Sequence, residues 1–353
     1  MEVGAAPGSL RLIQLRIGRR ISNPSPSFYP KVRCNLKGAG SNGVEPISQN
    51  LRMFILGMGF VGQYFAADLK QKGWVVSGTC TSTAMKMKLE QMGYDAYVFD
   101  ANEPQVEVLD IMKYHTHLLI SIPPVPDIGD PLLQHKELLK SRLRDGNLQW
   151  LSYLSSTRVY GDSGGAWVDE DHPIMPTSEL ARSRLAAEEG WSRLGQDLEI
   201  AVQIFRLGGI YGPGRSAIDT IIKKEPLSPS QRKRSSRRYT SRIHVSDICQ
   251  ALNASIEKPS NRRIYNIVDD DPAPRAEVFK FAQNLVKSKW QDHGREFTFP
   301  QVPETLPSEG VSTEEKRVNN ARMKLELGVK LRYPTYKSGL QDITDQMSDP
   351  FVS

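Results

Sequence analysis

The chain has 353 residues, of which 39% are hydrophobic, and a formal net charge of +6. Residues 1–50 carry +5 of that charge, so the rest is nearly neutral and its charge does not argue for nucleic-acid binding by the folded body. No apolar run approaches the roughly 18 residues of a membrane-spanning helix. Three cysteines, Cys34, Cys80 and Cys249, lie too far apart in sequence to indicate a disulfide framework, and the last two are expected to be buried thiols.

The first fifty residues are rich in Arg, Ser, Gly and Pro and poor in acids, a composition that is typical of an organelle transit peptide. The triplet Val32-Arg33-Cys34 resembles a plastid processing site. We therefore expect a chloroplast protein, with a mitochondrial presequence or an ordinary disordered tail as the alternatives. A single folded domain is expected over residues 51–350.

The first element of that domain is a short apolar strand at residues 53–56, followed by glycines with the spacing G-x-G-x-x-G and a helix over residues 60–72. The first glycine permits a tight turn, the second lets a pyrophosphate approach the backbone, and the third lets the helix pack on the strand. The helix would direct its N-terminal N–H groups at the phosphates. The residues expected to hold a dinucleotide here are Gly57, Gly59, Phe60, Val61 and Gly62.

Strand-like and helix-like segments then alternate, which predicts an α/β fold with a Rossmann-like, doubly wound parallel sheet of about seven strands. Further strands are expected at residues 74–78, 97–99, 118–122, 150–154, 198–205 and 264–268. Helices are expected at residues 84–92, 131–144, 178–194, 246–257, 274–287, 313–326 and 336–347. Two segments interrupt this alternation, at about 216–241 and 288–335, and are expected to form a small substrate cap near the carboxyl ends of the strands.

The end of the second strand bears on the choice of coenzyme. A site that prefers NAD would place an acid about 20 residues beyond the first glycine. Residues 77–82 contain no acid, whereas Thr81 and Ser82 offer hydroxyls and Lys86 lies nearby in sequence. This composition favours NADP over NAD.

Four later blocks, together with the glycine loop, resemble the extended and atypical short-chain dehydrogenase/reductases, the family of nucleotide-sugar epimerases and dehydratases. These blocks are SSTRVYG at 155–161, PTSELARSRLAAE at 176–188, RLGGIYGPGR at 206–215 and RIHVSDI at 242–248. The segments at 265–270 and 331–336 are similar to the bacterial YeeZ-type predicted epimerases in particular. The resemblance implies a Rossmann-type domain that binds NAD(P).

The second block departs from the family at its two main catalytic positions. Where the family has a proton-transferring Tyr and, four residues later, a Lys, this chain has Leu180 and Arg184. Leucine transfers no proton, while a charged arginine can still donate to the ribose hydroxyls of the coenzyme. Ser156 matches the family serine that hydrogen-bonds the reacting oxygen, or serves the backbone at the strand end. Tyr160 and Tyr211 are the candidates for a substitute phenol; the alternative for both, and the commoner one for tyrosines, is a buried hydroxyl that is hydrogen-bonded.

Three other polar features have weaker signals. Asp100 matches a family acid that hydrogen-bonds adenine, or is a turn or cap residue. His244 precedes a predicted helix, which favours a capping or surface role. No metal site is expected, because the histidines do not cluster with acids at ligand spacing, and His115 and His117 would share one strand face with no third ligand.

The sequence thus predicts an NAD(P)-binding, epimerase/dehydratase-like oxidoreductase of the atypical group that acts on a small-molecule or nucleotide-linked substrate, with ordinary catalysis in doubt. The alternative is a non-catalytic dinucleotide sensor or an RNA-binding plastid protein, since chloroplast stem-loop RNA-binding proteins also resemble this family. The basic run at 232–238, next to Tyr239, is read as a solvated loop, a diphosphate site or an RNA contact. No membrane partner is expected, and the resemblance allows a homodimer.

Overall fold

The computed structural model describes residues 51–223, 237–290 and 315–350. The chain divides into two units, residues 1–40 and 41–353, and every described residue belongs to the second unit. The expected transit peptide at residues 1–50 therefore lies outside the described residues. Within the described part, one large sheet is built from β1 (Arg52–Leu56), β2 (Val75–Cys80), β3 (Asp95–Val98), β4 (His117–Ile120), β5 (Trp150–Ser156), β7 (Ala201–Leu207) and β10 (Arg263–Ile267).

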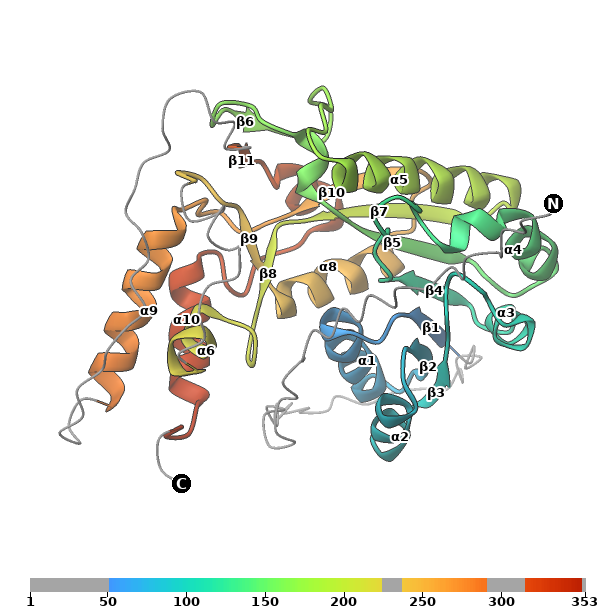
Figure 1. Cartoon of the computed structure of the whole chain (residues 1–353), viewed down its shortest axis with the longest axis horizontal. Helices are drawn as coiled ribbons and strands as arrows, with labels where there is room; N and C mark the ends of the chain where they lie inside the picture. The colour runs from blue at the N-terminus through green and yellow to red at the C-terminus, as the bar shows by residue number, and fades with distance from the viewer. Residues whose placement is uncertain (1–50, 224–236, 291–314, 351–353) are drawn as a thin grey trace, which may run out of the picture. The chain divides into compact units, whose positions relative to one another are not determined.

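The strands of this sheet lie in the order β10-β7-β5-β4-β1-β2-β3, and each neighbouring pair is parallel (Figure 1). The chain adds β2 and β3 on one side of β1 and then crosses over to add β4 on its other side. The order of the strands therefore reverses between β1 and β4, which are parallel neighbours with Met53 opposite His117. Ligands of open parallel sheets bind beyond the carboxyl ends of the strands at such a switch point. The predicted Rossmann-like, doubly wound α/β fold is confirmed.

Helices cover both faces of the sheet because the central strands are apolar on both sides. In β1, Met53 and Ile55 face one apolar cluster, while Phe54 and Leu56 face the other. The first cluster is completed by α1, α2 and α8, and the second by α3, α4 and α5. The bounds of these helices are α1 (Phe60–Gln71), α2 (Thr83–Gln91), α3 (Val106–Met112), α4 (Lys136–Leu143), α5 (Glu179–Asp197) and α8 (Val245–Glu257).

A smaller body lies at one end of the sheet, where α6 (Ala217–Lys223), α9 (Arg275–Trp290) and α10 (Tyr336–Gln346) share a third apolar cluster (Figure 1). Two small parallel sheets are also formed, β8 (Gly209–Tyr211) with β9 (Arg242–His244), and β6 (Trp167–Val168) with β11 (Arg317–Val318). Tyr211 of the first sheet belongs to the third apolar cluster, whereas Val168 and Val318 of the second pack with Val159 and Tyr160. The expected cap segments at 216–241 and 288–335 are described only in part, because residues 224–236 and 291–314 lie outside the described residues.

The helix expected at residues 313–326 is found only in its last part. Residues 321–322 are α-helical and lead into the π-helical turn η4 (Met323–Leu327), whereas the described chain before them forms β11 instead of a helix. The physical reason is pairing with β6: the Arg317 N–H donates to the Ala166 carbonyl at 2.9 Å and the Asn319 N–H to the Val168 carbonyl at 2.8 Å. These backbone groups cannot also close the bonds of a helix.

The structure also bears on the cysteines and on the length of apolar helices. Cys80 and Cys249 are buried free thiols, as expected, and burial raises the pKa of both. No helix in the described ranges is both long and apolar enough to cross a membrane.

Candidate functional site

The glycine loop after β1 is held in a tight turn by bonds to the end of β2. Gly57 has a φ of +92°, a conformation that favours glycine, and its N–H donates to Thr79 Oγ1 at 2.9 Å. The Met58 N–H donates to the Thr79 carbonyl at 2.8 Å. A Cβ on Gly62 would lie 2.7 Å from the Gly57 carbonyl oxygen, so the third glycine is required for the helix to approach the strand.

Gly59 leaves an opening at the start of α1. It is the N-cap residue, it supplies no side-chain bond to the helix, and a Cβ placed on it would meet no atom within 4 Å. The first N–H groups of a helix have no partner within the helix, and the positive end of its dipole favours an anion. Val61 is buried, so it would offer its backbone N–H, and Phe60 is half-buried beside it. These residues fit the pyrophosphate of a dinucleotide.

Three further residues were expected to contact the coenzyme: the hydroxyls of Thr81 and Ser82 and the carboxylate of Asp100. Ser82 and Asp100 have hydrogen-bond partners close by in sequence. Ser82 caps α2 by accepting from the Met85 N–H at 3.3 Å, whereas Thr81 is exposed at the end of β2. Asp100 Oδ1 accepts from both the backbone N–H and the side-chain Nδ2 of Asn102, each at 2.9 Å, which gives it the role of a turn residue. Thr81 is therefore the side chain that this end of β2 leaves open.

Ser156 ends β5, and the substituted family positions lie in the first turns of α5. The Ser156 hydroxyl accepts from the Arg158 N–H at 3.3 Å and caps the short helix η2 (Thr157–Tyr160), so it serves the backbone there. Leu180 lies half-buried in the first turn of α5. Arg184 follows one turn later, and its Nε is buried without a hydrogen-bond partner among the described residues. Burial lowers the pKa of Arg184, an effect that Tyr153 and Glu188 oppose and Arg158 reinforces.

Tyr160 belongs to a buried polar network. Its hydroxyl donates to Asn266 Oδ1 at 2.7 Å and accepts from Arg206 Nη1 at 3.0 Å. Arg206 also pairs with both carboxylate oxygens of Glu188, with Nη2 and Oε2 2.7 Å apart, and Ser155 bonds the same carboxylate. Burial raises the pKa of Tyr160 to about 12, although Arg206 opposes this. The phenol is thus committed to a structural network and poorly placed to release a proton.

Tyr211 is also buried, and it packs against His244 with ring centroids 5.1 Å apart. Its hydroxyl lies 3.5 Å from the Thr335 carbonyl oxygen, and burial raises its pKa. His244 caps α8, because its Nδ1 accepts from the Ser246 N–H at 3.2 Å. It is only 2% exposed, so the expected capping role is found but a surface position is not.

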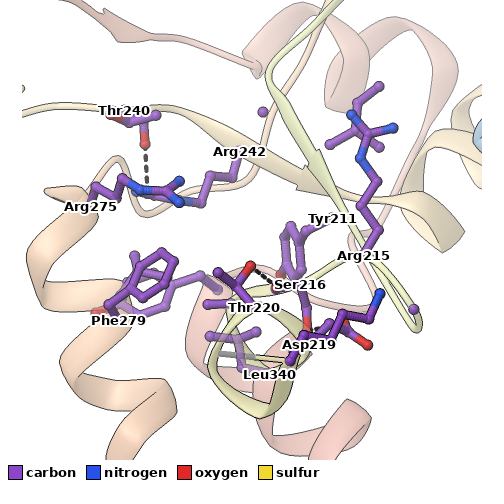
Figure 2. A pocket seen from close by; sticks show the side chains of 17 residues that line it. Tyr211, Arg215, Ser216, Asp219, Thr220, Thr240, Arg242, Arg275, Phe279 and Leu340 are labelled. Atoms are coloured by element: carbon purple, nitrogen blue, oxygen red, sulfur yellow. Dashed lines mark hydrogen bonds between the residues drawn. The ribbon is translucent and has the colours of Figure 1, made fainter. Parts of the chain in front are cut away.

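No sequence motif pointed to the cavity of about 360 Å³ that lies between β8, β9 and the helices of the smaller body (Figure 2). Its lining contains four basic side chains and one acid, Asp219, which accepts from the Ser216 hydroxyl at 2.5 Å. The lining residues are Gly209, Ile210, Tyr211, Gly214, Arg215, Ser216, Ala217, Asp219, Thr220, Lys223, Thr240, Arg242, Arg275, Val278, Phe279, Tyr336 and Leu340.

Arg242 is one of the four basic residues that line this cavity. Its guanidinium donates to the Thr240 carbonyl at 2.7 Å (Figure 2) and to the Ala273 carbonyl at 2.8 Å, and these two bonds orient it. Asp269 lies nearby, 2% exposed, and neither carboxylate oxygen has a hydrogen bond of normal geometry to another described residue. Burial raises the pKa of Asp269 well above its usual range, with Arg242 opposing the shift. The lining itself, with four basic side chains and one acid, is predominantly basic.

The cavity adjoins the glycine loop through one arginine and one aromatic ring. The Arg215 guanidinium carbon lies 5.3 Å from the centroid of the Phe60 ring, at the N-terminus of α1. The Tyr64 hydroxyl, one turn further along α1, donates to the Pro213 carbonyl at 3.1 Å. A dinucleotide at the loop and a ligand in the cavity would therefore be neighbours. Arg215 and Arg242 belong to the sequence blocks at 206–215 and 242–248 that resemble the family. Arg275 and Asp269 lie outside the four later blocks, and no catalytic or binding role was predicted for them.

The described residues contain no group of three or more His, Cys, Asp or Glu side chains that could hold a metal ion. The expectation that His115 and His117 share a face is wrong. His115 bonds the Ile111 carbonyl in the turn after α3 and packs on Phe54 at 5.1 Å, whereas His117 packs on Trp74 at 4.8 Å in the opposite cluster.

Comparisons with known proteins agree with this geometry. The profile of the NAD dependent epimerase/dehydratase family matches residues 134–268. The protein YeeZ of Escherichia coli (strain K12) is 28% identical over 223 residues, which cover 61% of this chain and 77% of YeeZ. A solved structure described as a functionally unknown conserved protein from Silicibacter pomeroyi is 32% identical, with a TM-score of 0.67, and the match covers 83% of this chain and 98% of that one.

The chain belongs to the NAD-dependent epimerase/dehydratase family. The fold extends to more distant members. The UDP-glucuronic acid 4-epimerase of Bacillus cereus, solved in complex with NAD, is 16% identical, with a TM-score of 0.63 over 84% of this chain and 96% of that one.

Proposed function

We propose that this chain is an atypical NAD(P)-dependent oxidoreductase of the epimerase/dehydratase family, which binds a nicotinamide dinucleotide at the glycine loop and an anionic small-molecule or nucleotide-linked substrate in the cavity. The observation that carries the proposal is the open position at Gly59 on the N-terminus of α1, next to the basic cavity. The coenzyme, when bound, supplies the hydride transfer that side chains cannot perform.

The chain's own residues would bind and orient the two ligands. The loop from Gly57 to Gly62 and the first N–H groups of α1 hold the pyrophosphate. Arg184 donates to ribose hydroxyls, and Ser156 offers a hydroxyl to the reacting oxygen. Arg242, fixed by two backbone carbonyls, attracts the anionic part of the substrate.

NADP is the proposed coenzyme, because the end of β2 carries an exposed Thr81 and no acid that would repel a 2′-phosphate. Calorimetric titration of the processed protein with both coenzymes tests this. Thr81→Asp should weaken NADP binding more than NAD binding. Equal binding of both coenzymes by the natural chain would contradict the preference, and heat with neither would contradict the whole proposal.

Ordinary epimerase turnover is expected to be slow. Leu180 transfers no proton, and the hydroxyls of Tyr160 and Tyr211 are buried. Loss of such a proton donor typically lowers the rate by roughly 10²–10⁴. A turnover screen with nucleotide sugars and small carbonyls measures this, and the double variant Leu180→Tyr/Arg184→Lys, which restores the family pair, should be faster than the natural chain. Fast turnover by the natural chain would contradict this role assignment.

The location follows from the composition of residues 1–50. We propose import into chloroplasts, with mitochondria as the alternative. Fusion of residues 1–50 to a fluorescent protein tests this, because a cytosolic signal would contradict both locations.

RNA binding is a second candidate function, which one surface feature favours. Trp167 is 51% exposed, and the Arg317 guanidinium lies 5.3 Å from its ring centroid and 4.8 Å from that of Tyr239. Stacked aromatic and guanidinium groups of this kind bind bases. Filter binding of plastid RNA at two salt concentrations tests it, since contacts to the phosphate backbone weaken steeply with salt. No retention at low salt would exclude this function.

A further inference from the structure

Arg215 lies at the boundary between the glycine loop and the cavity. Its side chain is exposed and is one of the four basic groups that line the cavity (Figure 2). Its guanidinium carbon also lies 5.3 Å from the centroid of the Phe60 ring. Phe60 is the first residue of α1 and directly follows Gly59, the open position at which the pyrophosphate of a dinucleotide is proposed to bind. One cation therefore borders both proposed ligand sites.

The backbone of Arg215 is fixed against α1, whereas its charged group has no bonded partner in the described part of the chain. Gly212 and Arg215 exchange two backbone hydrogen bonds, at 3.0 and 3.1 Å, and so close a tight turn. The carbonyl of Pro213 in this turn accepts from the Tyr64 hydroxyl at 3.1 Å, and a Cβ on Gly212 would lie 3.3 Å from Phe60 Cζ. The Arg215 guanidinium forms no hydrogen bond or ion pair with another described residue. Its donors thus remain available to a ligand.

The two proposed ligands would both bring negative charge to this boundary. The pyrophosphate of the coenzyme is anionic, and the basic lining of the cavity suits an anionic group. Charges act on each other over a Debye length of about 10 Å at 0.1 M salt, so two neighbouring anions repel each other unless a cation lies between them. The acid of the lining, Asp219, bonds the Ser216 hydroxyl at 2.5 Å and forms no ion pair with Arg215. Arg215 therefore stands where its charge can reduce this repulsion.

We propose that Arg215 is a shared counter-ion, which binds the anionic group of the substrate at the edge of the cavity and screens it from the phosphates of the coenzyme. This inference rests on the proposed function, because it requires both ligands. Without the positive charge, the coenzyme should repel the substrate, and by linkage each ligand should then weaken the binding of the other. The role of Arg215 is to let two anions occupy neighbouring sites.

The test measures by calorimetry how tightly inorganic phosphate binds to the processed full chain with and without a coenzyme. Because free phosphate also suits the empty glycine loop, the coenzyme-free state is measured in a Gly59→Ala background, in which a methyl group blocks that loop. In protein saturated with NADP, Arg215→Gln should weaken phosphate binding about tenfold. In the Gly59→Ala background, the same replacement should weaken phosphate binding about threefold or less.

Further variants separate the charge of the side chain from its packing. Arg215→Lys keeps the positive charge, and its NADP complex should bind phosphate within about threefold of the natural chain. Arg182→Gln is the matched control, since Arg182 is exposed on α5 and does not line the cavity, and it should change neither phosphate affinity. Circular dichroism and thermal melting establish that each variant is folded. If Arg215→Gln does not fold, Arg215→Met, which keeps an unbranched stem over the Phe60 ring, takes its place.

The outcomes separate this inference from the proposed function. Absence of binding of both NADP and NAD to the natural chain contradicts the proposed function, and this inference with it. Coenzyme binding together with equal weakening of phosphate binding in the two states overturns the inference alone, because Arg215 would then hold the anion without screening it. An unchanged phosphate affinity in Arg215→Gln overturns it as well. So does a loss in Arg215→Lys as large as in Arg215→Gln, which would assign the effect to packing on Phe60, and so does phosphate binding to the natural NADP complex weaker than about 10 mM.

Discussion

The Gly57 N–H donates to the Thr79 hydroxyl oxygen across 2.9 Å, and this bond ties the turn after β1 to the end of β2. Thr79 is 1% exposed and lies 22 residues beyond the glycine. Its carbonyl accepts a second bond from the Met58 N–H. The shape of the glycine loop therefore depends on a side chain outside the motif that identifies it.

Replacing Thr79 by valine should loosen this loop. The shape of the side chain is kept, but the Gly57 N–H loses its acceptor in a buried position, which costs about 1–3 kcal/mol. We expect a lower free energy of unfolding in urea and, because the backbone N–H groups of the loop are less well fixed, about tenfold weaker coenzyme binding by calorimetry. Thr79→Ser keeps the hydroxyl and should retain most of the coenzyme affinity. Equal coenzyme affinity in the valine and serine variants would contradict this role for the bond.

The second and third glycines of the loop should respond differently to alanine. A methyl group on Gly59 meets no protein atom within 4 Å, so Gly59→Ala should fold normally and lose coenzyme affinity by tenfold or more, because the methyl occupies the approach of the pyrophosphate. A methyl group on Gly62 would lie 2.7 Å from the Gly57 carbonyl oxygen, so Gly62→Ala should lower the melting temperature as well. Thermal melting and calorimetry of both variants make the comparison. Unchanged coenzyme binding by Gly59→Ala would place the pyrophosphate elsewhere.

The ion pair between Glu188 and Arg206 is buried at both ends, with the side chains 4% and 1% exposed. Glu188→Gln removes the charge that compensates Arg206 and should lower the free energy of unfolding by about 3–5 kcal/mol. Chemical denaturation measures this. Glu189→Gln is the control, because its 3.3 Å contact with Arg193 is exposed and such pairs contribute about 1 kcal/mol or less. Similar losses in the two variants would argue against a structural role for the buried network.

The sequence predicted the layered part of this fold well, because its signals are local. The seven parallel strands were each expected within a few residues of where they lie, and the glycine spacing located the turn at Gly57. β11 was missed because its two residues owe their conformation to β6, about 150 positions earlier, rather than to any periodicity of their own. The cavity was missed for a similar reason, since Arg242 on β9 and Arg275 on α9 are distant in sequence and line one cavity only in the folded chain.

His244 gives the fold a measurable dependence on pH. Burial lowers its pKa to about 4, an effect that Arg332 reinforces and Asp342 opposes, while the unfolded chain titrates near 6.5. Between these values the unfolded state binds a proton that the folded state does not, so stability is lost as the pH falls from about 6.5 toward 4. Asparagine also caps helices. His244→Asn should therefore keep the cap of α8 and remove the contribution of His244 to the pH dependence of stability.

The expected difference is about 2 kcal/mol: between pH 7 and pH 5, the natural chain should lose that much more unfolding free energy than His244→Asn. Urea denaturation at both pH values measures it. Other buried groups that titrate, such as His117 with its lowered pKa and Asp269 with its raised pKa, act in both proteins and cancel in the comparison. Equal losses in the two proteins would mean that His244 becomes protonated in the folded state as readily as in the unfolded chain. The tilted packing of its ring against Tyr333, with centroids 4.1 Å apart, would then not exclude water from the imidazole.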